Sequence, residues 1–174
     1  MPEHDVADLI RLFDDEFRAS HNTVLVRGGD EPIYLPADEQ HPQHRVIFAH
    51  GFYASALHEI AHWCIAGPER RLLVDYGYWY RPDGRTEAEQ AEFERVEARP
   101  QALEWAFSLA AGFRFNVSAD NLSGAPVDLA AFRRRVYAEL CRYWQQGLPP
   151  RAQRFFDRLR SFYGTEPRLP EAPD

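Results

Sequence analysis

The sequence predicts an α+β fold: a single, helix-dominated domain with a small β-sheet in its N-terminal half. The chain has 174 residues, of which 45% are hydrophobic and 14% aromatic, and a domain of this size can bury its own core without disulfides. Short β-branched and aromatic runs gather before residue 50, whereas apolar residues at helical spacing fill most of the remaining chain. No internal repeat divides the sequence.

A first amphipathic helix is expected over residues 5–19. Its apolar side chains recur every three or four positions, and carboxylates lie on the opposite face. The apolar positions are Val6, Leu9, Ile10, Phe13 and Phe17. This pattern indicates packing against a core.

Three short strands are expected next, because β-branched and aromatic residues alternate there and turn residues follow them. The expected strands cover residues 23–27, 32–35 and 45–49. A second helix should run from about 51 to 66, where the breaker pair Gly67-Pro68 stops it.

The second half of the chain is predicted to be mainly helical. Residues 72–80 form an aromatic-rich strand interrupted at Gly77, and a long helix follows over 86–113, in which Pro100 imposes a kink or a restart. Two more amphipathic helices are expected over residues 127–145 and 150–163. Residues 1–165 should then make the single domain, and residues 166–174 a flexible, proline-rich tail.

Composition and charge exclude several kinds of function. All 20 basic residues are arginine, so neither a Schiff-base lysine nor a Walker-type phosphate lysine is present. The net charge of −7 argues against nucleic acid as a ligand. The sequence shows no signal peptide and no apolar run long enough for a membrane span, and Cys64 and Cys141 lack the spacing of a thiolate zinc site. The cytoplasm is the expected compartment.

The segment His58-Glu59-Ile60-Ala61-His62 is an H-E-x-x-H motif inside the second expected helix. Two histidines four residues apart share one helix face, so both imidazoles can reach a single metal ion. Glu59 points about a quarter turn away, toward a metal-bound water or a substrate atom. The competing interpretation, that both histidines pair with carboxylates on an ordinary helix, is disfavoured because the helix is otherwise apolar.

A third metal ligand is expected from the next long helix. Glu97 ranks first, because it lies closest to the apolar part of that helix, and Glu94 shares nearly the same face. His50 and Asp75 are weaker alternatives. The other carboxylates of the segment, Glu87, Glu89 and Glu92, are expected on a solvated face.

Two imidazoles and one carboxylate define a ligand set but not a metal. Zn(II) in this set would make a small protease with Glu59 as general base, and Fe(II) would make an oxygenase in which Glu59 handles a proton. The H-x-D signature of 2-oxoglutarate oxygenases is absent. A third possibility is a non-catalytic module stabilised by its metal, which the size of the core makes unnecessary.

Longer stretches around the motif carry a resemblance. They are residues 30–38, 48–67, 74–85, 93–107 and 115–122, and over about 5–165 the chain resembles the bacterial elongation factor P hydroxylase family. The resemblance implies a zincin-like, metalloprotease-type fold and a non-haem iron enzyme that uses dioxygen to hydroxylate the β-lysylated lysine of elongation factor P. It implies His58, His62 and Glu97 as metal ligands, with Glu94 still open; the motif itself makes Glu59 the expected catalytic carboxylate.

A long, cationic substrate side chain should enter a pocket of carboxylates and aromatic walls. Candidates near the motif are Tyr53, Asp75, Tyr78, Trp79, Tyr80 and Asp83, although each is also a plausible packing residue. Because the chain is acidic, docking onto an acidic protein would depend on local arginines. These are Arg70, Arg71, Arg81 and Arg85.

Overall fold

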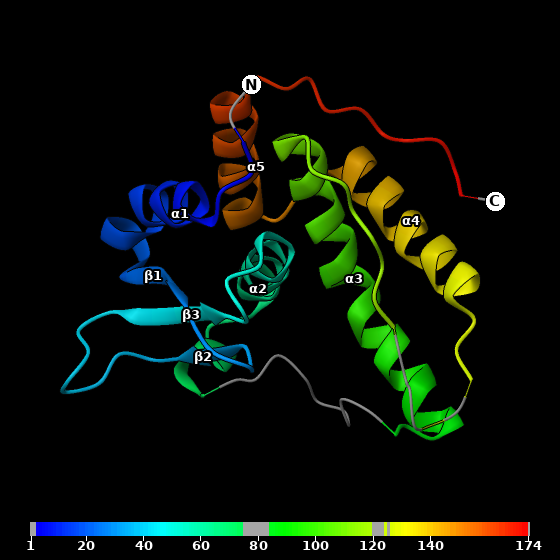
Figure 1. Cartoon of the computed structure of the whole chain (residues 1–174), viewed down its shortest axis with the longest axis horizontal. Coiled ribbons are helices and arrows are strands. Elements are labelled where there is room, and N and C mark those ends of the chain that lie inside the picture. The colour runs from blue at the N-terminus through cyan, green and yellow to red at the C-terminus, as the bar shows by residue number, and fades with distance from the viewer. Residues whose placement is uncertain (1–2, 75–83, 120–123, 125, 174) are drawn as a thin grey trace.

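The structure is a computed structural model that describes residues 3–74, 84–119, 124 and 126–173. Within these ranges the chain forms five α-helices, one short 3₁₀ helix and a three-stranded sheet near the N-terminus (Figure 1). The predicted helix-dominated α+β class is confirmed. None of the helices in the described ranges combines the length and the apolar character that crossing a bilayer requires.

The N-terminal part contains helix α1 (Val6–His21) and strands β1 (Thr23–Arg27), β2 (Ile33–Leu35) and β3 (His44–Phe48). The Asp5 side chain caps α1 by accepting a hydrogen bond from the Ala7 backbone N–H. Strand β3 lies in the middle of the sheet, parallel to β1 and antiparallel to β2. The three predicted strands are confirmed, each within one residue at either end.

Helix α2 (Tyr53–Ile65) follows the sheet, and the 3₁₀ helix η1 (Arg70–Leu72) follows α2. The strand predicted over 72–80 does not begin where expected, because Leu72 ends η1 and the next two described residues are outside any strand. The other residues of that prediction, 75–80, lie outside the described ranges.

Helix α3 (Glu87–Ala111) starts at a capping box between Thr86 and Glu89 and ends at Gly112, whose φ of 67° is left-handed. Of the kink or restart predicted at Pro100, the restart is wrong, because α3 is continuous through this residue. Burial of Pro100 and of most later residues of α3 against neighbouring helices outweighs the one backbone hydrogen bond that proline removes.

Helices α4 (Leu129–Gln146) and α5 (Pro150–Tyr163) pack on α3. After α5 the chain extends beside the ends of the helices in Figure 1. The Thr165 hydroxyl donates to the Ala110 carbonyl at 2.6 Å, and the Tyr137 hydroxyl donates to the Pro170 carbonyl at 2.6 Å. These bonds connect the proline-rich tail to α3 and α4.

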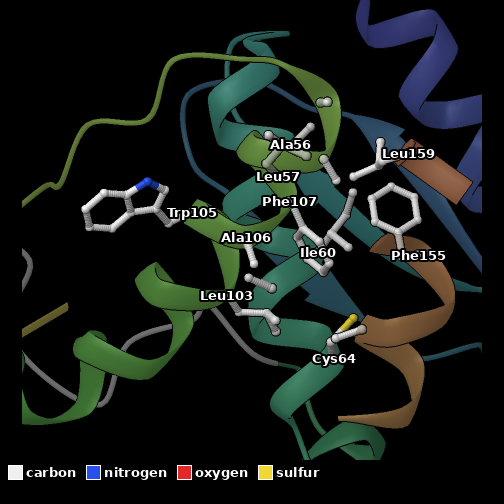
Figure 2. Packing of buried hydrophobic residues seen from close by; sticks show 14 of the residues in the cluster. Ala56, Leu57, Ile60, Cys64, Leu103, Trp105, Ala106, Phe107, Phe155 and Leu159 are labelled. Carbon is white, nitrogen blue, oxygen red and sulfur yellow. The ribbon is translucent and has the colours of Figure 1, made fainter. Parts of the chain in front are cut away.

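Helix α2 lies at the centre of the fold, in contact with β3, α1, α3 and α5. Its apolar side chains pack against residues of α3 and α5, as Figure 2 shows. The labelled α2 residues of this core are Ala56, Leu57, Ile60 and Cys64. Because the core fixes α2 against α3, it also fixes the polar side chains that the two helices direct toward each other.

Candidate metal centre

Two histidines of α2 and one glutamate of α3 meet where the two helices pack. The Nε2 atom of His58 lies 2.9 Å from Oε1 of Glu97, and the Nε2 atom of His62 lies 3.1 Å from Oε2 of the same carboxylate. The two Nε2 atoms are 3.1 Å apart. One ligand atom from each residue thus lies within 4.8 Å of the others, a spacing that one metal ion can bridge.

The three side chains differ in exposure. Glu97 is 2% exposed and His62 is 8% exposed, whereas a quarter of the His58 side chain is open to solvent. Burial acts to raise the pKa of Glu97, but the neighbouring His62 and His58 outweigh it and hold the pKa well below its usual range. Glu97 is therefore a charged carboxylate at neutral pH, as a metal ligand must be.

Glu104 is a fourth member of this cluster, which sequence reasoning missed. Its Oε1 atom lies 2.6 Å from Nδ1 of His58, on the side of the ring away from Glu97. The sequence feature that could have identified it is its spacing, since Glu104 follows Glu97 by seven residues and shares its helix face. The apolar sequence around it, LEWAF, instead indicates packing.

Gln101 lies between the two glutamates on the same face of α3. Its Nε2 donates to Oε1 of Glu97 at 3.4 Å and to the Ser118 carbonyl at 2.6 Å. Its Oε1 accepts from the Ser118 backbone N–H at 2.9 Å. Gln101 thereby attaches the segment after α3 to the helix beside the metal candidate.

Glu59 is half-buried on α2, near enough to both histidines of the motif to interact with them electrostatically. Burial raises its pKa, although His58 and His62 act in the opposite direction. It lines a small pocket of about 20 Å³, room for one water molecule. The other lining residues are Ile33, Tyr34, Val46, His62, Trp63, Ala66, Arg70 and Arg71.

Two of the alternative ligands, Glu94 and His50, do not join this group. Glu94 is half-buried on α3 but is not among the residues that converge on the histidines. His50 lies outside the group too: its Nδ1 is 3.8 Å from an oxygen of the exposed Asp30. Asp75 falls outside the described residues.

Of the residues predicted to line a substrate pocket, the structure describes Tyr53 alone. Tyr53 is buried at the start of α2 and donates its hydroxyl to Tyr163 at 2.8 Å, so it packs in the core and does not line the pocket beside Glu59. The remaining candidates lie outside the described residues: Tyr78, Trp79, Tyr80 and Asp83, as well as Asp75.

Of the four docking arginines, Arg70 and Arg71 line the pocket beside Glu59, and Arg81 is outside the described ranges. The prediction that Arg85 is a docking residue at the surface is wrong. Arg85 is 1% exposed, its guanidinium lies 3.9 Å from the centre of the Phe93 ring, and its Nε donates to Gln90 at 2.6 Å. A buried guanidinium held this way supports the fold and cannot attract a partner at the surface.

Comparison with known proteins covers most of the chain. A model of the elongation factor P hydroxylase family matches residues 12–172. The chain is also 54% identical over 164 residues to a Haemophilus influenzae protein named elongation factor P lysine hydroxylase, and the alignment covers 94% of this chain and 92% of the relative. Both helices that carry the converging side chains lie within the family match.

Proposed function

The chain belongs to the elongation factor P hydroxylase family, and on this premise we propose that it hydroxylates the β-lysylated lysine of elongation factor P in an iron- and dioxygen-dependent reaction. The resemblance found in the sequence is thereby confirmed at the level of the family. The observation that carries the proposal is the convergence of His58, His62 and Glu97 inside a chain of this family.

The three residues suit a non-haem iron ion. Two imidazole Nε2 atoms and a buried carboxylate leave open positions for other ligands, and no cysteine of the described residues belongs to the cluster. Cys64 packs in the core on another face of α2, and burial raises the pKa of its thiol to about 12. His58, His62 and Glu97 would hold Fe(II), which would supply dioxygen activation: one oxygen atom would enter a C–H bond of the lysine and the other would leave as water, with two electrons from an external reductant and two protons from solvent.

The protein's own residues prepare the reaction site. The negative charge of Glu97 would offset part of the charge of a divalent cation. His58 and His62 would bind the same cation from one face of α2. Glu59, whose pKa burial raises, can hold or release a proton next to a space that admits a molecule the size of water or dioxygen. Arg70 and Arg71, at the rim of the same pocket, are the remaining described candidates for docking an acidic protein surface.

We also propose that the arrangement is zincin-like: a central helix bearing the H-E-x-x-H motif, a second helix that supplies the carboxylate, and a small sheet beside them. Residues 1–165 would form the catalytic domain, and residues 166–174 its tail. Because the proposed substrate is a translation factor, the cytoplasm is the expected compartment.

The test is an incubation of β-lysylated elongation factor P with the iron-loaded protein, with and without dioxygen, followed by intact mass measurement. We expect a gain of one oxygen atom on the modified lysine that requires dioxygen and disappears in the His58→Ala and His62→Ala variants. An unchanged mass with wild-type enzyme and reductant present would reject the proposal. Cleavage of the substrate chain would instead identify a small zinc protease.

A further inference from the structure

Glu104 contacts His58 of the candidate metal centre at the ring nitrogen that faces away from Glu97. It is 8% exposed, and its Oε1 atom is 2.6 Å from Nδ1 of His58, whose Nε2 faces Glu97. We propose that Glu104 is a positioning residue that fixes the ring orientation and the tautomer of His58, and thereby sets how tightly the centre binds its metal. This inference rests on the proposed metal site.

The position of the proton on the His58 ring decides which nitrogen can bind a metal. A neutral imidazole carries one N–H, and an ionised carboxylate can only accept a hydrogen bond. The short contact to Glu104 therefore keeps a proton on Nδ1, so that when a metal ion displaces the other proton of His58, the lone pair that becomes free is that of Nε2, on the side of Glu97 and His62. That is the tautomer in which both α2 histidines present Nε2 to one ion.

Burying the carboxylate of Glu104 costs free energy. Its carboxylate lies within an otherwise apolar part of α3, between Leu103 and Trp105, and burial raises its pKa. Within the described ranges, the contact with His58 is the one hydrogen bond that this carboxylate makes. A leucine or methionine would avoid this cost, so packing alone does not account for a glutamate at this position.

The two histidines differ in how far their surroundings enclose them. The side chain of His62 is 10% exposed, whereas that of His58 is 25% exposed. Among the described residues, no side-chain hydrogen bond is found at Nδ1 of His62. His58, as the less enclosed ligand, has the greater need of a partner that prevents its ring from turning.

The experiment measures Co(II) binding to the metal-free full chain, by visible absorption and competition with a chelator. Glu104→Ala should weaken binding about 10- to 100-fold and change the cobalt absorption bands, because a freely rotating His58 ring alters the coordination. Glu104→Gln, which can still accept from Nδ1 through its amide oxygen, should restore part of the affinity and serves if the alanine variant does not fold. Glu92→Gln, at an exposed position of the same helix, is the matched control and should bind like wild type.

A second measurement separates positioning from general stability. Nitrogen NMR of the zinc-loaded protein reports the tautomer of each ring, and we expect His58 with its proton on Nδ1 in wild type and a mixture in Glu104→Ala. Wild-type affinity and spectrum in both Glu104 variants would overturn the inference while leaving the metal site intact. Failure of the wild-type protein to bind metal would instead overturn the proposed metal site on which the inference rests.

Discussion

The Nε2 atom of His58 lies 2.9 Å from Oε1 of Glu97, although the two residues belong to different helices. This contact joins α2 to α3 at the point where a metal ligand set would close. Glu97→Ala should therefore reduce affinity for a divalent metal more than the roughly 100-fold upper range typical of residues outside the ligand shell. Glu94→Ala, on the same helix, is the control and should bind metal normally; calorimetric titration of both variants checks this. The opposite ranking would make Glu94 the ligand.

Glu59 should matter for turnover and not for metal affinity. Glu59→Gln keeps the size of the side chain but removes the proton-accepting carboxylate, so we expect kcat to fall about 10²- to 10⁴-fold while the metal content stays the same. The exposed Glu69→Gln, just beyond α2, is the control. Steady-state hydroxylation rates with metal analysis of each sample test this; an unchanged kcat in Glu59→Gln would remove Glu59 from the reaction.

Metal binding should release a proton from His58. Burial acts to lower its pKa, but the carboxylates of Glu97 and Glu104 outweigh this and raise the pKa well above the ordinary value of 6.5. At pH 7 the metal-free protein therefore holds an extra proton, which the ion must displace from Nε2. Calorimetry in two buffers of different ionisation enthalpy should show about one proton released.

The sign of the pH dependence follows from the raised pKa. The charged His58 stabilises the metal-free fold fully below the unfolded-state pKa, and this contribution is lost as the pH rises through the higher folded-state pKa. Metal affinity should change in the opposite direction and increase with pH over the same window. Affinity that stays constant between pH 6 and pH 8 would contradict this assignment.

Arg85 should be essential for stability. Replacing it with alanine removes a buried guanidinium that contacts Phe93 and leaves Gln90 without its 2.6 Å partner, so we expect a loss of about 2–4 kcal/mol in the free energy of unfolding. Arg95→Ala is the control, because Arg95 is exposed in an i,i+3 pair with Glu92 and should cost less than about 1 kcal/mol. Urea denaturation measures both. Equal, small losses would mean that Arg85 contributes no more than a surface residue.

Local patterns predicted much of the fold. Apolar spacing identified the helices that became α1, α4 and α5, because each has a core-facing stripe that the structure buries, and the breaker pair Gly67-Pro68 marked the end of α2. The restart considered at Pro100 did not occur, since the local cost of proline is small against the tertiary packing of α3. The strand start predicted at Leu72 was wrong, because Leu72 ends the 3₁₀ helix η1, and aromatic and β-branched composition alone does not fix where a strand begins.

The candidate site was predictable only in part. The spacing of His58 and His62 depends on one helix and is visible in sequence, and the rank of Glu97 above Glu94 followed from its apolar neighbours. The role of Glu104 depends on a contact with His58 on α2, 46 residues away in sequence, and the role of Arg85 depends on how its side chain folds back onto Gln90 and Phe93 of α3. No local pattern reports which way such side chains turn once the helices pack.

The most direct test of the metal centre is a crystal structure of the iron-loaded protein with data collected at the iron absorption edge. We expect one anomalous peak about 2.0–2.2 Å from Nε2 of His58, Nε2 of His62 and a carboxylate oxygen of Glu97. A peak bound elsewhere, or one that lacks Glu97 as a neighbour, would contradict it.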